Sequence, residues 1–260
     1  MIDILRAKKV FANYIKNYNL EDPKIRIKIK HIQRVAKANK SIAQALGLEQ
    51  EDILLAELIG LLHDIGRFEQ VRIYHTFLDK VSINHAQEGI QVLFEQGLIR
   101  EFIEDTQYDE IIKKAILNHN RLAIEEGLNQ RELLHAKMIR DADKMDIFEV
   151  ITTEELKHNV AFPEKPIAEA KISKEVLEKF RQGIPIRYEE MQSNIDHIII
   201  WITYVYDLNF SVTLEKIRQK EYIRKLISMV DYEDAETKEI MEQVYKIVND
   251  YIETKCSKGC

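Results

Sequence analysis

Apolar residues recur along most of the chain at alternating three- and four-residue steps, the spacing that places them on one face of a helix. This pattern predicts a series of amphipathic helices, over residues 4–18, 23–47, 84–97, 108–120, 131–150, 188–208, 212–229 and 234–252. Ile25, Ile27 and Ile29 also alternate as a strand would, but the helical spacing continues to Gly47 and explains more residues. Residues 160–185 contain three of the 4 prolines and are predicted to form a turn-rich connection with one short helix.

One apolar run differs from the others, because residues 53–62 are hydrophobic almost all round. A helix of that kind is buried on most sides. The run ends in His63 and Asp64, and Gly66 is predicted to end the helix because glycine adopts the left-handed conformation at low cost. Residues 67–82 show no convincing period and are predicted to form an ordered loop. Burying an imidazole and a carboxylate is unfavourable unless they are paired or bind a metal, so chemistry is expected at this doublet.

The composition supports an all-α fold. The 260 residues are 45% hydrophobic and 32% charged, with only 8 glycines and 4 prolines to interrupt helices. No low-complexity tract, internal repeat or polar linker divides the sequence. We therefore predict one all-helical domain over residues 1–260.

Net charge, the N-terminal sequence and the cysteines limit the partners and the cellular compartment to be expected. The net charge of −6 argues against general nucleic-acid binding. The N-terminus lacks a signal-peptide pattern, and no apolar run approaches the roughly 20 residues that a membrane span needs. Both cysteines, Cys256 and Cys260, lie in the last few residues, so a disulfide framework is not expected. These features predict a cytoplasmic protein without a membrane partner, and they leave its oligomeric state undetermined.

Several predicted helices or helix ends carry candidate metal ligands, which are His31, His63, Asp64, His85, His119 and Asp143. Imidazole nitrogens and carboxylate oxygens suit divalent transition metals, and facing helices of a bundle can bring them together. Each histidine taken alone is better explained as a structural residue. That interpretation is kept for the remaining four, His75, His135, His158 and His197.

Two longer motifs carry a family resemblance. They are Leu-Leu-His-Asp-Ile-Gly-Arg at 61–67 and Ile-Arg-Asp-Ala-Asp-Lys-Met-Asp at 139–146. With His31 they resemble the HD-domain superfamily of metal-dependent phosphohydrolases, whose pattern is a His, a later His-Asp doublet and a final Asp. The family's Ala-Asp-basic-hydrophobic setting selects Asp143 rather than Asp141. The resemblance implies a helical bundle over about 25–150 with a metal between its helices, and further N- and C-terminal helices packed on it.

A subset of this family binds two metals through additional histidines, and His85 and His119 resemble those positions. The resemblance therefore implies one or two divalent ions, of Mn, Fe, Zn, Co, Ni or Mg. The members that hydrolyse cyclic dinucleotides have two adjacent histidines and then a Gly-Tyr-Pro signature. Here His119 is followed by Asn120 and the signature is missing, which argues against that substrate class.

The predicted activity is hydrolysis of a phosphoester in a small nucleotide-like substrate by metal-activated hydroxide. Asp64 is expected to bridge two ions. Arg67 is the first candidate to contact the phosphoryl oxygens, because its planar fork suits them, and Lys144 is the second. The alternative is a non-catalytic nucleotide-binding signalling module that uses the same pocket. A structural zinc site is disfavoured, because such sites tend to be closed and rich in cysteine.

Overall fold

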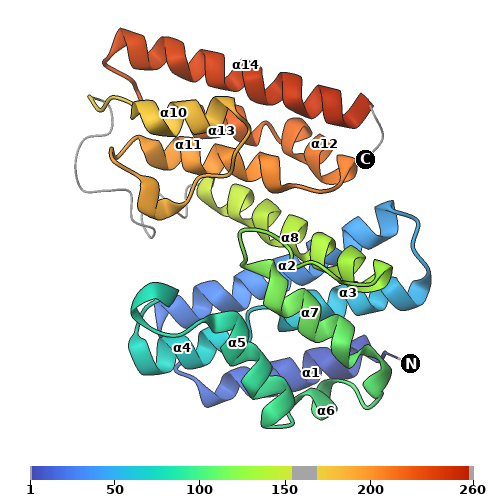
Figure 1. Cartoon of the computed structure of the whole chain (residues 1–260). Helices are drawn as coiled ribbons and strands as arrows, with labels where there is room; N and C mark the ends of the chain where they lie inside the picture. Colours follow the sequence, from blue (N-terminus) through green and yellow to red (C-terminus); the bar gives the residue numbers. More distant parts are fainter. Residues whose placement is uncertain (1, 154–168, 258–260) are drawn as a thin grey trace. The chain divides into compact units, whose positions relative to one another are not determined.

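The structure is a computed structural model that describes residues 2–153 and 169–257. Every regular element within those ranges is helical, which confirms the all-α class (Figure 1). The chain divides into two compact units, residues 1–146 and 147–260. The single domain predicted for residues 1–260 stays a prediction. No helix among the described residues has the length and apolar character needed to cross a membrane.

The first unit contains α1–α7 and most of α8. Their bounds are α1 Ile4–Tyr14, α2 Pro23–Ala45, α3 Gln50–Leu62, α4 Gly66–Tyr74, α5 His85–Ile90, α6 Ile99–Phe102, α7 Asp109–His119 and α8 Gln130–Ile151. Side chains cap the starts of two helices: Asp3 accepts from the backbone N–H groups of residues 5 and 6, and Asp22 from that of residue 24, with Pro23 in the first turn. Such caps satisfy donors that have no partner within the helix.

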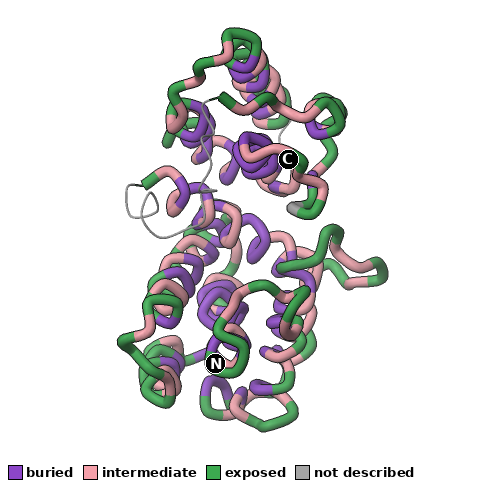
Figure 2. Tube along the Cα trace, turned by 90° about the vertical axis from the view of Figure 1, so that its left-hand side faces the viewer, coloured by how far each residue is buried: buried purple, intermediate pink, exposed green. Residues whose placement is uncertain are grey.

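The helix α3 lies in the interior of the first unit, as its apolar sequence predicts. All eight residues from Leu55 to Leu62 are buried. It packs along α2 (Figure 1), where Gly60 approaches the backbone of Ala36 so closely that a Cβ at residue 60 would lie 2.6 Å from the Ala36 Cα. In Figure 2 the buried residues gather on the inner sides of the helices, and exposed residues follow loops and outer faces.

The segment after the His-Asp doublet differs from the prediction of a loop. Residues 66–74 form α4, and a short 3-10 turn, η2 Asp79–Val81, follows. Gly66 begins this helix instead of ending the previous one, so the role predicted for it was wrong. Its actual role is close packing, because a Cβ there would lie 2.3 Å from the His85 carbonyl oxygen and 2.5 Å from the Gly89 nitrogen.

The second unit is also helical, but two of its predicted long helices are interrupted. Its helices are α10 Lys174–Arg181, α11 Asp196–Thr203, α12 Ser211–Gln219, α13 Tyr222–Ile227 and α14 Ala235–Ser257. A left-handed residue, Glu221 with φ 54°, separates α12 from α13 within the predicted helix 212–229. Residues 160–168 of the predicted turn-rich connection lie outside the described residues, and α10 is a short helix within the remainder, as predicted.

Candidate metal centre

The first unit brings all six predicted ligands to one buried place. His31 comes from the middle of α2, and His63 and Asp64 follow directly after α3. The remaining three, His85, His119 and Asp143, lie at the start of α5, at the end of α7 and within α8. Four histidines and Asp64 are buried, and the Asp143 side chain is 18% exposed. Five helices or helix ends therefore meet around one carboxylate, that of Asp64.

The four imidazoles are oriented in the same way. The Nδ1 atoms of His63 and His119 lie 2.8 and 2.6 Å from the carbonyl oxygens of Gly60 and Ile116. A carbonyl only accepts, so each Nδ1 carries the proton. The Nδ1 atoms of the other two rings lie against carboxylates, His31 at 2.7 Å from Asp146 and His85 at 2.6 Å from Asp79. A histidine held in this way by its outer nitrogen presents the other nitrogen, Nε2, to a metal.

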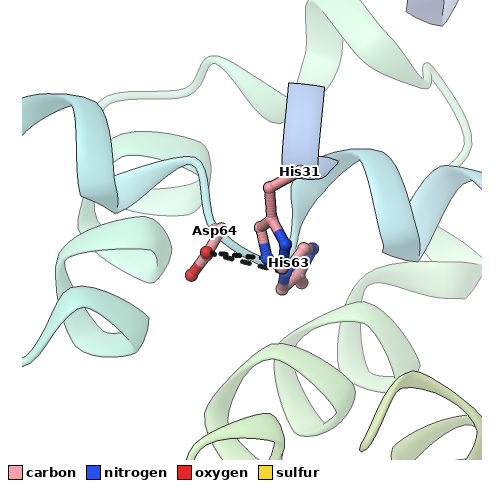
Figure 3. Close-up of side chains that lie close together, drawn as sticks. All are labelled: His31, His63 and Asp64. Atoms are coloured by element: carbon pink, nitrogen blue, oxygen red, sulfur yellow. Dashed lines mark hydrogen bonds and ion pairs between the residues drawn. The ribbon is translucent and has the colours of Figure 1, made fainter. Parts of the chain in front are cut away.

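The Nε2 atoms form two groups that share Asp64. One group combines His31, His63 and Asp64, with the Asp64 Oδ2 atom 3.4 and 3.7 Å from the two Nε2 atoms (Figure 3). Asp143 adjoins this group, its Oδ1 atom lying 3.2 Å from His31 Nε2.

The second group combines Asp64 with His85 and His119. Here the Asp64 Oδ1 atom lies 3.4 and 3.5 Å from the two Nε2 atoms. Because the two oxygens of Asp64 face different groups, each group could hold a cation and the two groups would share this carboxylate.

Three features of these groups are what divalent cations would explain. His85 and His119 point their Nε2 atoms at each other across 3.0 Å, and those of His31 and His63 are 3.3 Å apart. Two lone pairs at such distances repel unless a proton or a cation lies between them. The buried Asp64 Oδ1 atom has no hydrogen-bond partner among the described residues. Buried groups of this kind are normally satisfied, and a metal ion held by each group would satisfy them.

Burial sets the protonation of two of the rings. It lowers the pKa of His63 to about 3 and that of His85 to about 4, so both rings are neutral at pH 7, as metal ligands must be. Burial and the Lys28 charge also act to lower the pKa of His31. The hydrogen bonds from its ring to Asp143, Asp146 and Asp64 outweigh them and raise that pKa to about 10. Protons and metal ions therefore compete for His31.

The sequence did not assign three charged residues that belong to the centre. Lys28 places its Nζ atom 2.6 Å from Asp64 Oδ2. Asp79 and Asp146 hold the outer nitrogens of His85 and His31. Helical spacing offered a signal for two of them, because Lys28 is three residues before His31 and Asp146 is three residues after Asp143. Asp79 lies in the segment 67–82, which was predicted to be a loop beside the site, but without a period its role could not be assigned.

The two residues predicted to contact a phosphate, Arg67 and Lys144, lie in different surroundings. Arg67 lies beside the centre with its Nε atom 3.6 Å from Asp64 Oδ1, and its side chain is 15% exposed. Its Nη1 atom lies within hydrogen-bond distance of Gln70, the Phe77 carbonyl and Asp79, which fixes the guanidinium in place. Lys144 follows Asp143 on α8 and is half-buried.

The other histidines do not belong to these two groups or lie outside the described residues. His75 is exposed and ends α4 in a left-handed conformation. His135 is buried and its Nε2 atom lies 2.9 Å from Asp52 Oδ1, a structural pairing. His197 is buried in α11 of the second unit, and residue 158 lies outside the described residues.

Fold and site together define a class: a helical bundle with a buried His/Asp cluster between its helices that could hold metal ions. Residues 29–147 match the family described as HD domain. This segment of the chain is therefore similar to the HD-domain family, whose members are generally metal-dependent hydrolases. No curated protein and no solved structure matches the chain.

Proposed function

We propose that this protein is a metal-dependent phosphohydrolase that cleaves a phosphoester of a small, nucleotide-like substrate. One observation carries the proposal: two groups of three ligands share the Asp64 carboxylate, and the ligand atoms of each group lie within 4.8 Å of one another. The ligands are His31, His63 and Asp143 on one side and His85 and His119 on the other. When bound there, divalent ions would supply an activated water near neutral pH and polarise a phosphoryl oxygen.

The residues around the ligands suit a phosphate group. Negative charge grows on phosphoryl oxygens during attack, and fixed cations stabilise it. Lys28 and Arg67 both reach the Asp64 carboxylate, and both lie over the ring of Phe77, at 5.3 and 5.8 Å from its centroid. They are therefore held at one edge of the centre. We assign Arg67 and Lys28 to phosphate binding and keep Lys144 as a further candidate.

A substrate screen tests this function. The purified protein is stripped with a chelator, reloaded with Mn²⁺, Fe²⁺, Co²⁺, Ni²⁺, Zn²⁺ or Mg²⁺, and assayed against nucleoside monophosphates, dinucleotides, p-nitrophenyl phosphate and bis-p-nitrophenyl phosphate. We expect metal-dependent hydrolysis of at least one phosphoester, and none in Asp64→Asn. Asp250→Asn, which changes an exposed aspartate of α14, is the matched control. Nucleotide binding without turnover under every metal would instead favour the non-catalytic signalling module.

A further inference from the structure

Gln70 of α4 is a buried polar residue that has no part in the assignments above. Its side chain is completely buried, with an exposed fraction of 0%, and it follows Arg67 by three residues, so the two side chains are neighbours on the helix. Burying an amide is unfavourable unless its oxygen and its NH₂ group both find partners. Both ends of the Gln70 amide have partners, and these partners belong to the candidate metal centre.

The two ends of the amide reach different parts of the centre. The Oε1 atom accepts a hydrogen bond from Arg67 Nη1 at 2.6 Å. The Nε2 atom donates to Asp79 Oδ1 at 2.9 Å, to the Ser82 hydroxyl at 2.8 Å and to the Ile83 carbonyl at 3.1 Å. The reverse orientation would turn the NH₂ group towards a guanidinium, which has only donors, and the oxygen towards a carboxylate. The surrounding groups therefore fix which end points where.

Asp79 extends this network to a candidate metal ligand. Its Oδ1 atom accepts from Gln70 and, at 2.8 Å, from Arg67, while its Oδ2 atom lies 2.6 Å from His85 Nδ1. The Asp79 side chain is 30% exposed, so packing alone does not hold it. The hydrogen bonds from α4 thus determine where this carboxylate lies and, through it, how the His85 ring is oriented.

The same network anchors Arg67 at one nitrogen only. All three hydrogen bonds of the guanidinium to described residues use Nη1, and they go to Gln70, the Phe77 carbonyl and Asp79. The Nε atom is buried and has no hydrogen-bond partner among the described residues, although it lies 3.6 Å from Asp64 Oδ1. Charge on a phosphoryl oxygen is best stabilised by donors that are fixed before the reaction begins. Anchoring through Nη1 fixes the plane of the guanidinium and leaves Nε for a substrate.

We propose that Gln70 is a positioning residue that holds Arg67 and His85 together as one preorganised unit. Its oxygen anchors Arg67, and its NH₂ group holds Asp79, which in turn holds His85. Glutamate at this position would keep the acceptor but place a second carboxylate next to Asp79, and methionine would offer neither an acceptor nor a donor. The inference deepens the proposed hydrolase function and rests on it.

Metal titration tests the link to His85 without any turnover. Chelator-stripped protein is titrated with Co²⁺, and binding is followed by calorimetry. In Gln70→Met the ion of the second group, that of Asp64, His85 and His119, should bind about 10-fold more weakly, the lower end of what losing an outer partner of a metal-bound histidine costs, and the other ion should stay within about 2-fold. Gln70→Glu keeps the size and polarity of the side chain and should weaken the same ion. Gln87→Met, at an exposed glutamine of α5, is the matched control.

The variant His119→Ala identifies which ion is affected, because it keeps only the first group intact. Adding Gln70→Met to this variant should leave the affinity of the remaining ion within about 2-fold. Equal weakening of both ions would indicate a general loss of structure and overturn the positioning role. Unchanged affinity for both ions in Gln70→Met and Gln70→Glu would overturn it as well.

Turnover at saturating metal tests the link to Arg67 by a double-mutant cycle. Gln70→Met should lower kcat by about 10-fold in the wild type but by less than about 2-fold in Arg67→Lys, because a residue that acts through Arg67 has little left to position there. A loss of the same size in both backgrounds refutes this link. Absence of turnover in the wild type with every metal and substrate refutes the hydrolase proposal instead, and the metal titration still decides whether Gln70 positions His85.

Discussion

At the scale of single residues, we expect both ligand groups to need Asp64 for metal binding. Its two oxygens face different histidine pairs, so its loss should affect both groups at once. We expect Asp64→Asn to lose nearly all bound metal and His119→Ala to fall from two equivalents to about one. Elemental analysis of the purified proteins measures this, with Asp250→Asn as control. Two equivalents retained in Asp64→Asn would show that it does not bridge.

Arg67 supplies the second residue-scale prediction. If it stabilises charge in the transition state, its loss lowers kcat more than it raises KM. Arg67→Lys keeps the charge but not the planar fork, so we expect kcat to fall by about 10²-fold while metal content is unchanged. Arg72→Lys, at an exposed arginine of the same helix, should retain full activity. A loss confined to KM would assign Arg67 to ground-state binding only.

The sequence pointed to the candidate ligands more readily than to the residues that hold them in place. His31, His63, Asp64 and Asp143 stand out because each is a polar residue within or beside an apolar stretch. Lys28 and Asp146 lie on helices where exposed charges are common, so their spacing alone did not distinguish them. Asp79 reaches His85 only because η2 follows α4 closely, a tertiary arrangement that a local pattern does not encode.

At the scale of elements, the close approach of α4 and α5 positions His85 beside Asp64. Gly66 permits this approach, because any side chain there would meet the backbone of residues 85 and 89. The backbone atoms cannot move aside as a side chain could, so Gly66→Ala should destabilise the fold by about 1–3 kcal/mol or more. Gly89→Ala is the control, since its new Cβ would find nothing nearer than 3.6 Å. Denaturant unfolding of both variants measures the difference, and equal stability would contradict the packing role.

The pairing of α8 with α3 through His135 and Asp52 predicts a dependence of stability on pH. Burial lowers the pKa of His135 below its ordinary value of about 6.5, although the hydrogen bond to Asp52 acts in the opposite direction. The unfolded state therefore binds a proton first, and stability falls as pH decreases through 6.5 towards the lower folded pKa. One such proton accounts for up to about 1.4 kcal/mol per pH unit.

His135→Gln keeps a donor for Asp52 but cannot titrate. The slope of unfolding free energy between pH 7 and pH 5 should therefore be smaller in this variant than in the wild type, as measured by urea unfolding. His75→Gln, at an exposed histidine, should leave the slope unchanged. An unchanged slope in His135→Gln would mean that His135 binds its proton equally well in both states.

At the scale of the whole molecule, the helical patterns predicted the fold class and most helices, but not how the second unit is divided. The chain between 212 and 229 is amphipathic throughout, and its break at Glu221 leaves no glycine or proline in the sequence. A non-glycine residue with positive φ is uncommon and is held there by packing, which local propensity does not contain. No shift in composition marked the boundary between the two compact units, because this boundary falls inside one continuous helix, α8.

The position of that boundary predicts that the two units unfold together. Because α8 runs continuously through the boundary, unfolding one unit alone would break the last turns of this helix away from the rest, and we expect one calorimetric transition for the whole chain. All proposed metal ligands lie within residues 1–146. Metal at 100 times its dissociation constant stabilises the folded state by about 2.7 kcal/mol. Chelation should then lower the single transition by about 2–4 °C for each kcal/mol lost. Two transitions, of which only one responds to the chelator, would refute the single domain while still assigning the metal to one unit.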